Sequence, residues 1–148
     1  GTPEKWGISA NSDPNFSAKI EDGALKLEAK SRTKWYSVYL APADVKALPV
    51  PKEGEVCRIE FSYRQKNEGL KGHAFGTVEI RTGDHKRLAH KDGIDLAPDA
   101  DWTERKLILD LAEIPADGKY VLLSFFLGDA TGTARFDDVK LTVRTVKK

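Results

Sequence analysis

The stretch that decides the fold class is EVCRIEFSYRQ, residues 55–65. Every second residue in it is apolar or aromatic: Cys57, Ile59, Phe61 and Tyr63. The residues between them are polar or charged: Arg58, Glu60, Ser62 and Arg64. Successive side chains of a β-strand point to opposite faces, so this alternation predicts a strand with one buried face. Cys57 falls on that face, and we therefore expect a small core residue rather than a reactive thiol.

The same alternation recurs along the chain, and turn signals separate the runs. The runs occupy residues 23–30, 34–41, 75–83, 104–109 and 134–143, and a further run at 119–129 is apolar on both faces. The Gly- and Asp-rich segments at 67–74, 82–87, 90–95 and 115–119 predict loops, and residues 42–55 can hold one helical turn. This pattern predicts an all-β fold, a two-sheet antiparallel β-sandwich, with residues 1–148 as a single domain.

The composition argues against several functional classes. The 148 residues include 24 Lys plus Arg and 23 Asp plus Glu, for a net charge of +1. This balance argues against a nucleic-acid partner, which needs a basic stripe, and against a polybasic membrane surface. No apolar run approaches the roughly 18 residues that span a bilayer. The single cysteine cannot form an internal disulfide, and the absence of methionine indicates a processed part of a longer protein.

No established catalytic motif is present. His73, His85 and His90 lie in predicted loops, and none has a second His or Cys at a zinc-binding spacing. Nucleophile-elbow, P-loop and dinucleotide-binding motifs are also missing. Glu60 and Glu79 both point outward from predicted strands, so they would form a glycosidase pair if their strands were neighbours. We favour solvated glutamates over this catalytic pair.

The run ARFDDVKLTV, residues 134–143, places a carboxylate where the alternation predicts the core. Asp137 shares its alternation with Val139, Leu141 and Val143. A buried carboxylate is costly unless a cation or several hydrogen-bond donors compensate it. The compensating group is either a Ca²⁺ ion, a Lys or Arg side chain, or a set of backbone N–H groups.

Several segments together resemble the jelly-roll carbohydrate-binding modules of families four, nine, sixteen and twenty-two. These are DGALKLEA at 22–29, KWYSVYLAP at 34–42, GEVCRIEFSYR at 54–64 and FFLGDATGTARFDDVKLTV at 125–143. The resemblance implies a non-catalytic jelly roll, attached to the catalytic domain of a secreted polysaccharide-degrading enzyme. It also implies a structural Ca²⁺ held by Asp137 and by backbone carbonyls near Gly23, with Thr2 or Glu4 as further contributors.

Outward-pointing aromatic residues are the first candidates for contact with a sugar. Trp35 and Tyr39 stand on the polar side of one predicted strand, where their rings can stack on a sugar. The alternative is that the loop at 42–51 folds back and covers them. The resemblance implies sugar contacts at the positions of Tyr39 and Phe126, and a core position for Trp102. We expect Trp6 to be structural as well.

Arginines on the outward side add a second type of contact. Arg64 and Arg81 can hold a carboxylate or sulfate with their planar guanidinium groups, which suggests an acidic glycan. The equally weighted alternative is that Glu60 and Glu79 neutralise them in cross-strand pairs. The predicted ligand-binding residues are Trp35, Tyr39, Arg64, Glu79, Arg81 and Phe126.

The predicted function is therefore non-catalytic binding of a polysaccharide or oligosaccharide by a concave sheet. The expected partners are this glycan and a covalently linked catalytic domain, with no nucleic acid and no membrane. The expected location is extracellular or at the cell surface. Two alternatives remain: a structural or adhesion sandwich whose aromatic residues are packed, and a small jelly-roll lyase or glycosidase.

Overall fold

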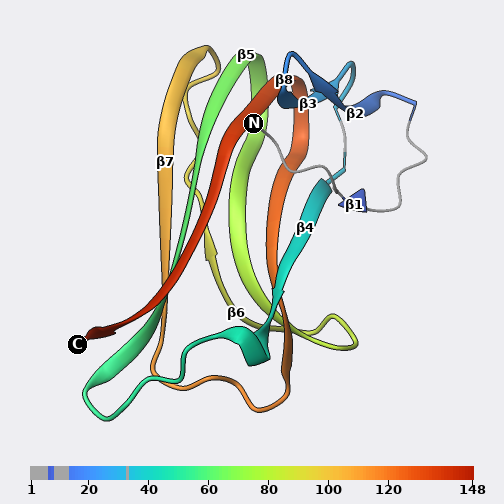
Figure 1. Cartoon of the computed structure of the whole chain (residues 1–148). Helices are drawn as coiled ribbons and strands as arrows, with labels where there is room; N and C mark the ends of the chain where they lie inside the picture. Colours follow the sequence, from blue (N-terminus) through green and yellow to red (C-terminus); the bar gives the residue numbers. More distant parts are fainter. Residues whose placement is uncertain (1–6, 9–13, 33) are drawn as a thin grey trace.

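The computed structural model describes residues 7–8, 14–32 and 34–148 (Figure 1). Its strands in chain order are β1 (Gly7–Ile8), β2 (Phe16–Glu21), β3 (Ala24–Ala29), β4 (Tyr36–Asp44), β5 (Glu55–Thr82), β6 (Arg87–Asp92), β7 (Ala100–Leu111) and β8 (Gly118–Lys147). A short 3-10 helix, η1 (Val45–Ala47), follows β4 and is the helical turn expected in residues 42–55. Within these described ranges, no helix has the length and apolar character needed to cross a membrane. The all-β prediction is confirmed.

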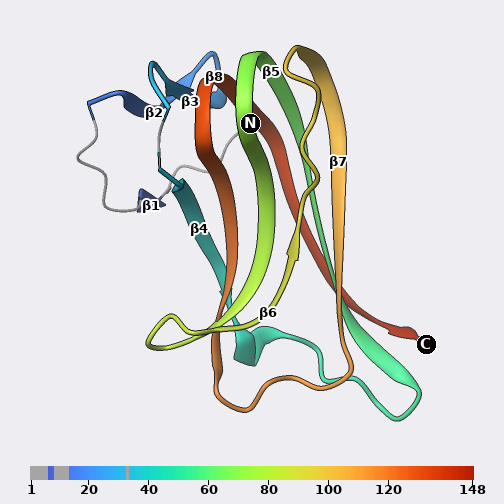
Figure 2. The same cartoon turned by 180° about the vertical axis from the view of Figure 1, so that it is seen from behind.

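β5 and β8 are long antiparallel strands that bend together at one end of the molecule, where both arch over in Figures 1 and 2. Gly72 and Gly132 stand at this bend with φ angles of +112° and +106°. A Cβ atom on Gly72 would lie 2.3 Å from the carbonyl oxygen of Asp129, and one on Gly132 would lie 2.3 Å from that of Gly69. Glycine is required at both positions because of the φ angle and because the backbones approach so closely.

This bend folds one continuous hydrogen-bonded sheet into two facing layers, so that β5 and β8 belong to both. The first layer has the order β7, β5 (55–67), β8 (133–147), β3, β2. The second has the order β6, β5 (73–82), β8 (118–128), β4, β1. The antiparallel β-sandwich expected from the sequence is therefore confirmed, with its two layers joined through the bend.

Aromatic rings fill the space between the layers. Phe61 and Tyr63 of the first layer contact Phe125 of the second, at ring-centroid distances of 5.6 and 5.3 Å. Phe136 packs on Phe125 at 4.5 Å. The Tyr63 hydroxyl accepts a hydrogen bond from the Gly76 N–H at 2.8 Å, which ties the layers together. Burial raises the pKa of Tyr63, so the phenol stays neutral.

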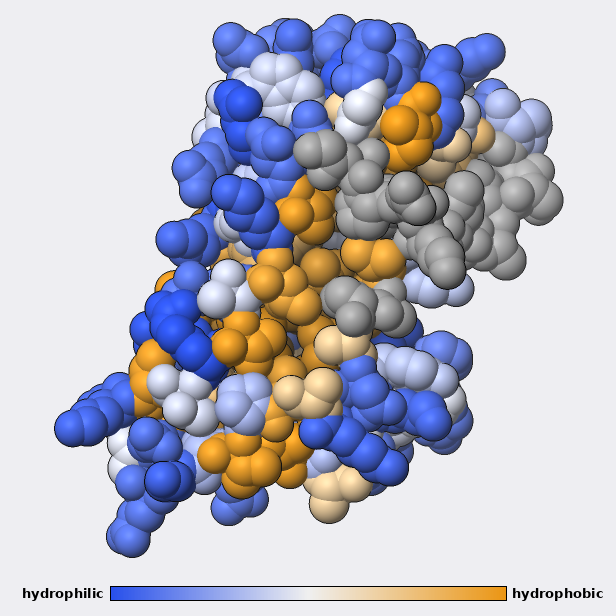
Figure 3. Space-filling model, viewed as in Figure 1, coloured by the Kyte–Doolittle hydropathy of each residue, from blue (hydrophilic) through white to orange (hydrophobic). Residues whose placement is uncertain are grey.

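Along one edge of the sandwich, apolar side chains are partly exposed to solvent. Figure 3 shows an apolar strip between β4 and the C-terminal half of β8. Tyr36 on β4 and Val139, Leu141 and Val143 on β8 are only partly buried and pack against the core. The interior is thus less completely covered here than around Phe125, which has 0% exposure.

Several local predictions can be compared directly with the structure. Cys57 is fully buried, as expected. The Asp22-Gly23 turn is a two-residue hairpin in which both φ angles are positive, 53° and 80°. The prediction of a loop at 67–74 is wrong, because this segment is the bend within β5. β6 overlaps two segments predicted as loops and pairs with β5. The core position expected for Trp102 is also wrong, because this side chain is half-buried on the outer surface of the first layer.

Candidate functional site

The outer surfaces of the two layers differ in chemistry. The second layer presents what we call the aromatic face: Trp35, Ser37, Tyr39, His73, Phe75, Thr77, Glu79, Arg81, Arg87, His90, Asp92, Tyr120, Leu122, Ser124 and Phe126. The first layer presents the charged face: Arg58, Glu60, Arg64, Lys66, Glu68, Trp102, Glu104, Lys106, Asp110, Arg135, Asp137, Lys140 and Arg144. Rings and small polar groups characterise one face, and ionic side chains the other.

The aromatic face is hollowed along its centre. Thr77 and Glu79 have 0% exposure and Ser124 has 2%, although all three point away from the core. A hollow of ≈ 250 Å³ opens above Ser124, lined also by Ser37, Tyr39, Arg81, His85 and Leu122. Tyr39 keeps 38% of its surface exposed at the wall of this hollow. The face therefore offers a concave surface with both a ring and hydrogen-bonding groups.

Trp35 lies flat on the backbone of the neighbouring strand. A Cβ atom on Gly128 would fall 2.1 Å from Cδ2 and from Cε3 of the indole, so the ring occupies the space that a side chain would fill. Despite this contact, 52% of the surface of Trp35 is exposed. The loop after β4 does not cover it. The glycine thus provides a seat for the indole and leaves much of the ring available to a ligand.

Other rings surround Trp35 and hold it in place. His73 stacks on it with a centroid distance of 5.3 Å and an interplanar angle of 15°. Phe75 and Phe126 meet it edge-on at 6.0 and 6.4 Å. His73 is itself positioned by Asp95, whose Oδ2 lies 2.6 Å from the His73 Nδ1. Phe126 therefore belongs to an outward-facing aromatic cluster and not to the core between the layers.

Glu79 lies on the floor of the aromatic face between two arginines. Its Oε2 accepts a hydrogen bond from Nε of Arg81 at 2.5 Å. Its Oε1 accepts one from Nη2 of Arg87, on the neighbouring strand β6. The sequence suggested that Glu79 would neutralise an arginine, and the structure shows two guanidinium groups around this one carboxylate. Arg81, which lines the hollow, is thereby oriented at one end of it.

Arg64 is separated from the other predicted ligand-binding residues. It lies on the charged face, 3.7 Å from the carboxylate of Asp138 and with its guanidinium 5.7 Å from the centre of the Trp102 ring. Trp35, Tyr39, Glu79, Arg81 and Phe126 share the aromatic face. Outward orientation alone did not distinguish the two faces, and Arg64 cannot share a groove with the other five.

The same separation applies to the two glutamates considered for catalysis. Glu60 lies on the charged face and accepts a hydrogen bond from Arg144 at 2.6 Å. Glu79 lies on the aromatic face, on the opposite side of the sandwich. A glycosidase pair requires both carboxyl groups to flank one bond of the substrate. Glu60 and Glu79 do not meet this requirement.

Asp137 points away from the core, contrary to the expectation from alternation. Ser62 pairs with Lys140 but Arg64 pairs with Asp137, so β8 has one residue more than β5 between these pairs. This β-bulge includes Asp138, whose φ is +52°. It shifts the alternation by one position, so that Phe136 is buried and Asp137 joins Arg64 on the charged face.

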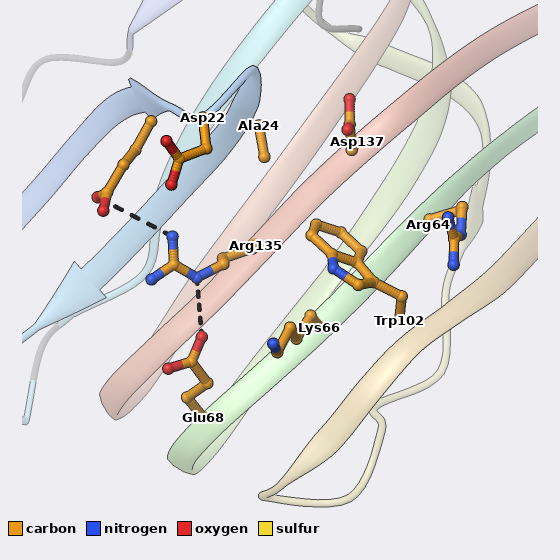
Figure 4. A pocket seen from close by; sticks show the side chains of 9 residues that line it. Asp22, Ala24, Arg64, Lys66, Glu68, Trp102, Arg135 and Asp137 are labelled. Carbon is orange, nitrogen blue, oxygen red and sulfur yellow. Dashed lines mark hydrogen bonds and ion pairs between the residues drawn. The ribbon is translucent and has the colours of Figure 1, made fainter.

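Asp137 lines a pocket of ≈ 440 Å³ on the charged face, together with Asp22 and Ala24 on either side of Gly23 (Figure 4). The two predicted calcium-binding positions are thus at one pocket. Arg64, Lys66 and Arg135 line it as well, with Arg135 bonded to Glu68 at 2.8 Å. In the described part of the chain, no three acidic, His or Cys side chains gather as a metal would require. Thr2, Glu4 and Trp6 lie outside the described residues, and Ca²⁺ at this pocket stays a prediction.

The sequence did not identify several residues of the aromatic face. His73 and Phe75 lie at and beyond the bend, where a segment rich in glycine suggested a loop. Arg87 lies at the start of β6, which was not expected to be a strand. One signal could have identified His73 and Phe75. They continue the alternation of Thr77 and Glu79 towards the N-terminus, so they point outward as those two residues do.

No protein-family model matches the sequence, and no curated protein matches it either. Solved structures share its fold. The enzymatically active domain of bacteriophage CBA120 tailspike protein 4 matches with a TM-score of 0.68 and 9% identity, over 95% of this chain and 20% of that chain. This chain therefore spans one fifth of the tailspike chain's length.

Two carbohydrate-binding modules match over most of both chains. A family 4 module has a TM-score of 0.57 and 16% identity, with 94% of this chain and 86% of that chain covered. The family 11 module of Clostridium thermocellum, in complex with a β-1,3-1,4-mixed-linked tetrasaccharide, has a TM-score of 0.56 and 13% identity, with 95% and 89% covered. These likenesses confirm the jelly-roll fold of carbohydrate-binding modules that was expected from the sequence.

Proposed function

We propose that this chain binds a polysaccharide through its aromatic face without altering it chemically. The observation that carries the proposal is the position of Trp35, which is seated on Gly128 and 52% exposed at one end of a concave surface. A sugar ring has an apolar C–H surface that stacks on an aromatic ring. Its hydroxyls need polar partners, and Tyr39, Ser124 and Arg81 line the adjacent hollow.

The expected affinity is modest. The hollow is shallow, and binding exchanges hydrogen bonds to water for hydrogen bonds to protein. Modest affinity suffices when a binding module is tethered to an enzyme, because the tether raises the local concentration of enzyme at its polymer. We therefore also propose a catalytic domain elsewhere in the parent protein, and an extracellular or cell-surface location where polysaccharides are found.

The test compares three single substitutions in a binding assay against a panel of polysaccharides. We expect Trp35→Ala to weaken binding at least about tenfold, because stacking of a sugar on an aromatic ring that it covers contributes about 1.4 kcal/mol or more. Tyr39→Ala should weaken it in the same direction. Trp102→Ala is the matched control, since Trp102 is an aromatic residue on the opposite face. The measurement is isothermal titration with the polysaccharide that the panel selects.

Two outcomes would contradict the proposal. Unchanged binding by Trp35→Ala would show that the aromatic face is not the site, and loss of binding in Trp102→Ala alone would move the site to the charged face. Release of reducing or unsaturated ends from the polymer by the unmodified chain would contradict the non-catalytic part of the proposal.

A structural Ca²⁺ near Asp137 and Gly23 stays a separate proposal. It rests on the resemblance and on the position of both residues at one pocket. A bound ion that prefers the folded state stabilises it by mass action, so a chelator should lower the thermal midpoint and added Ca²⁺ should restore it. Asp137→Ala should abolish that response. An identical midpoint with and without chelator would exclude the ion.

A further inference from the structure

We infer that the hollow of the aromatic face binds an anionic group of the polysaccharide, a carboxylate or a sulfate. This rests on the proposed function and narrows it to acidic glycans. The groups that carry it are Arg81 and Arg87, both held by the buried carboxylate of Glu79.

The burial of Glu79 is the first step. Burying a carboxylate to 0% exposure costs free energy, even on the outward side of a sheet, and a small neutral polar residue at position 79 would avoid that cost. Its two oxygens each hold one guanidinium group, from β5 and from β6. A buried acid that bonds two cations restricts how those cations can move. Glu79 is therefore a positioning residue for Arg81 and Arg87.

The orientation of Arg81 is the second step. Its Nε is the atom bonded to Glu79, which leaves the two terminal amino groups for another partner. The same side chain lines the hollow beside Tyr39, Ser124 and His85. Two parallel N–H groups in a plane match the oxygens of a carboxylate or sulfate, and Arg makes such paired hydrogen bonds more readily than Lys.

The local charge is the third step. Residues 79–87, which include the turn from β5 to β6 at this end of the hollow, carry three cations, Arg81, Lys86 and Arg87, against two anions, Glu79 and Asp84. Lys119 is held at this end, with its Cδ 3.5 Å from a Cβ placed on Gly83 and its ammonium 5.9 Å from the Tyr120 ring. His85 stacks on the same Tyr120 ring.

On the charged face, by contrast, Arg58 has a carboxylate to itself and uses both Nε and Nη2 on it, at 2.9 and 3.0 Å from the oxygens of Asp110. At the hollow, Arg81 and Arg87 share the single carboxylate of Glu79, so one positive charge is left over there, and a polymer carrying negative groups would gain from it.

The experiment uses pairs of polymers that differ only in charge. De-esterified polygalacturonate is compared with its methyl-esterified form, and dextran sulfate with dextran, by isothermal titration. We expect the acidic member of at least one pair to bind more tightly, and the pair that responds identifies carboxylate or sulfate. Added NaCl should weaken that binding, because salt screens the charges. Equal binding of the acidic and neutral members in both pairs would overturn the inference. The proposed function would still stand if neutral glycans bound in a Trp35-dependent way.

Substitutions then locate the anionic subsite. We expect Arg81→Gln to weaken binding of the acidic polymer about tenfold or more, the range for hydrogen bonds to a charged group. Arg58→Gln, on the charged face, removes the same charge and should change nothing. Arg81→Lys keeps the charge but loses the planar fork, so it should also weaken binding. Equal affinities for Arg81→Lys and the unmodified chain would overturn the geometric part of the inference, and equal effects of Arg81→Gln and Arg58→Gln would overturn the site.

Glu79→Gln separates positioning from simple charge attraction. It makes the hollow more positive, so a site that depended on charge alone would bind the acidic polymer more tightly. We expect weaker binding, because the two arginines lose their shared anchor. Retained affinity for a neutral glycan that binds through Trp35 shows that the variant is folded. Tighter binding of the acidic polymer by this folded variant would overturn the positioning role of Glu79.

Discussion

Among single residues, Gly128 has an effect that its own chemistry does not suggest. It has no side chain, and this absence lets the Trp35 indole lie against the strand. A side chain at this position would lift the ring away from the face. Most of the geometry of the proposed stacking surface thus depends on a residue that would not itself touch the sugar.

We expect Gly128→Ala to weaken polysaccharide binding about as much as Trp35→Ala does. The new methyl group would lie 2.1 Å from the indole, so the ring must move off its seat. Because Trp35 is exposed, stability should fall by no more than about 1 kcal/mol. Titration with the selected polysaccharide and thermal unfolding measure the two effects. Gly83→Ala is the control, since its methyl group would meet Lys119 at an ordinary 3.5 Å. Unchanged binding in Gly128→Ala would show that the position of the Trp35 ring against Gly128 does not matter for polysaccharide binding.

Asp138 shows how a single residue limits prediction from sequence. Alternation correctly assigned the buried side of residues 55–65, because this part of β5 pairs with β7 in a regular register up to Gln65. It failed for Asp137 because the extra residue at the bulge reverses the assignment. Asp adopts a positive φ more readily than most residues, but nothing in FDDV distinguishes a bulged pair from a regular one.

Among the elements, β5 and β8 determine the architecture. Each runs through both layers, and the bend between the layers is set by glycines with left-handed φ angles. The sequence indicated extended segments in the halves of both strands, through alternation in β5 and in the C-terminal half of β8, and through a run that is apolar on both faces in the N-terminal half of β8. It could not show that the halves are continuous, because a glycine-rich segment is compatible with either a loop or a bend. It also could not show which outward residues share a face, because that depends on pairing partners far away in the sequence.

The bend offers a matched pair of substitutions. We expect Gly132→Ala to destabilise the fold by more than about 3 kcal/mol, because strain at its φ adds to a collision with the backbone of Gly69. Gly69→Ala should cost about 1–2 kcal/mol, since φ there is +55° and nothing lies within 4 Å of the added atom. Urea unfolding monitored by circular dichroism gives both values. Equal losses in the two variants would contradict the close approach at the bend.

For the molecule as a whole, the two outer faces suggest a division of roles. The charged face is a network of ion pairs across three strands, and the aromatic face gathers rings around a hollow. Networks of this kind contribute little per pair when exposed, and their contribution depends on pH and salt. The proposed binding surface and the pH-dependent surface are therefore on opposite sides of the sandwich.

Acid should weaken the fold through the charged face. A hydrogen bond from Arg144 lowers the pKa of Glu60, and bonds from Arg135 and Arg58 lower the pKa values of Glu68 and Asp110. Their pKa values in the folded state lie below the ordinary 4.5 and 3.8, so the unfolded chain binds protons first as pH falls. The stabilisation is complete above these ordinary values and is lost as pH drops through the lowered ones.

We expect the urea midpoint to be steady from pH 7 to about pH 5 and to fall as the pH drops below about 4. Glu60→Gln removes one contributor, so its midpoint should lie below that of the unmodified chain at pH 7, and the difference should shrink as the pH falls through the lowered pKa of Glu60. A constant difference between the two chains across this range would contradict the role assigned to the Glu60–Arg144 pair. Unfolding in 1 M NaCl should reduce the difference at pH 7, because salt screens exposed pairs.

The place of β8 in the chain has a consequence for biosynthesis. It follows every other strand, and β3, β4 and β5 all pair with it. While a ribosome is still translating this stretch, the inward side of β5 lacks Phe125 and Phe136, the β8 rings that pack against Phe61 and Tyr63, and the sandwich cannot close. We therefore expect this jelly roll to complete its folding only after β8 has emerged from the exit tunnel, and the apolar surface exposed until then is prone to aggregate.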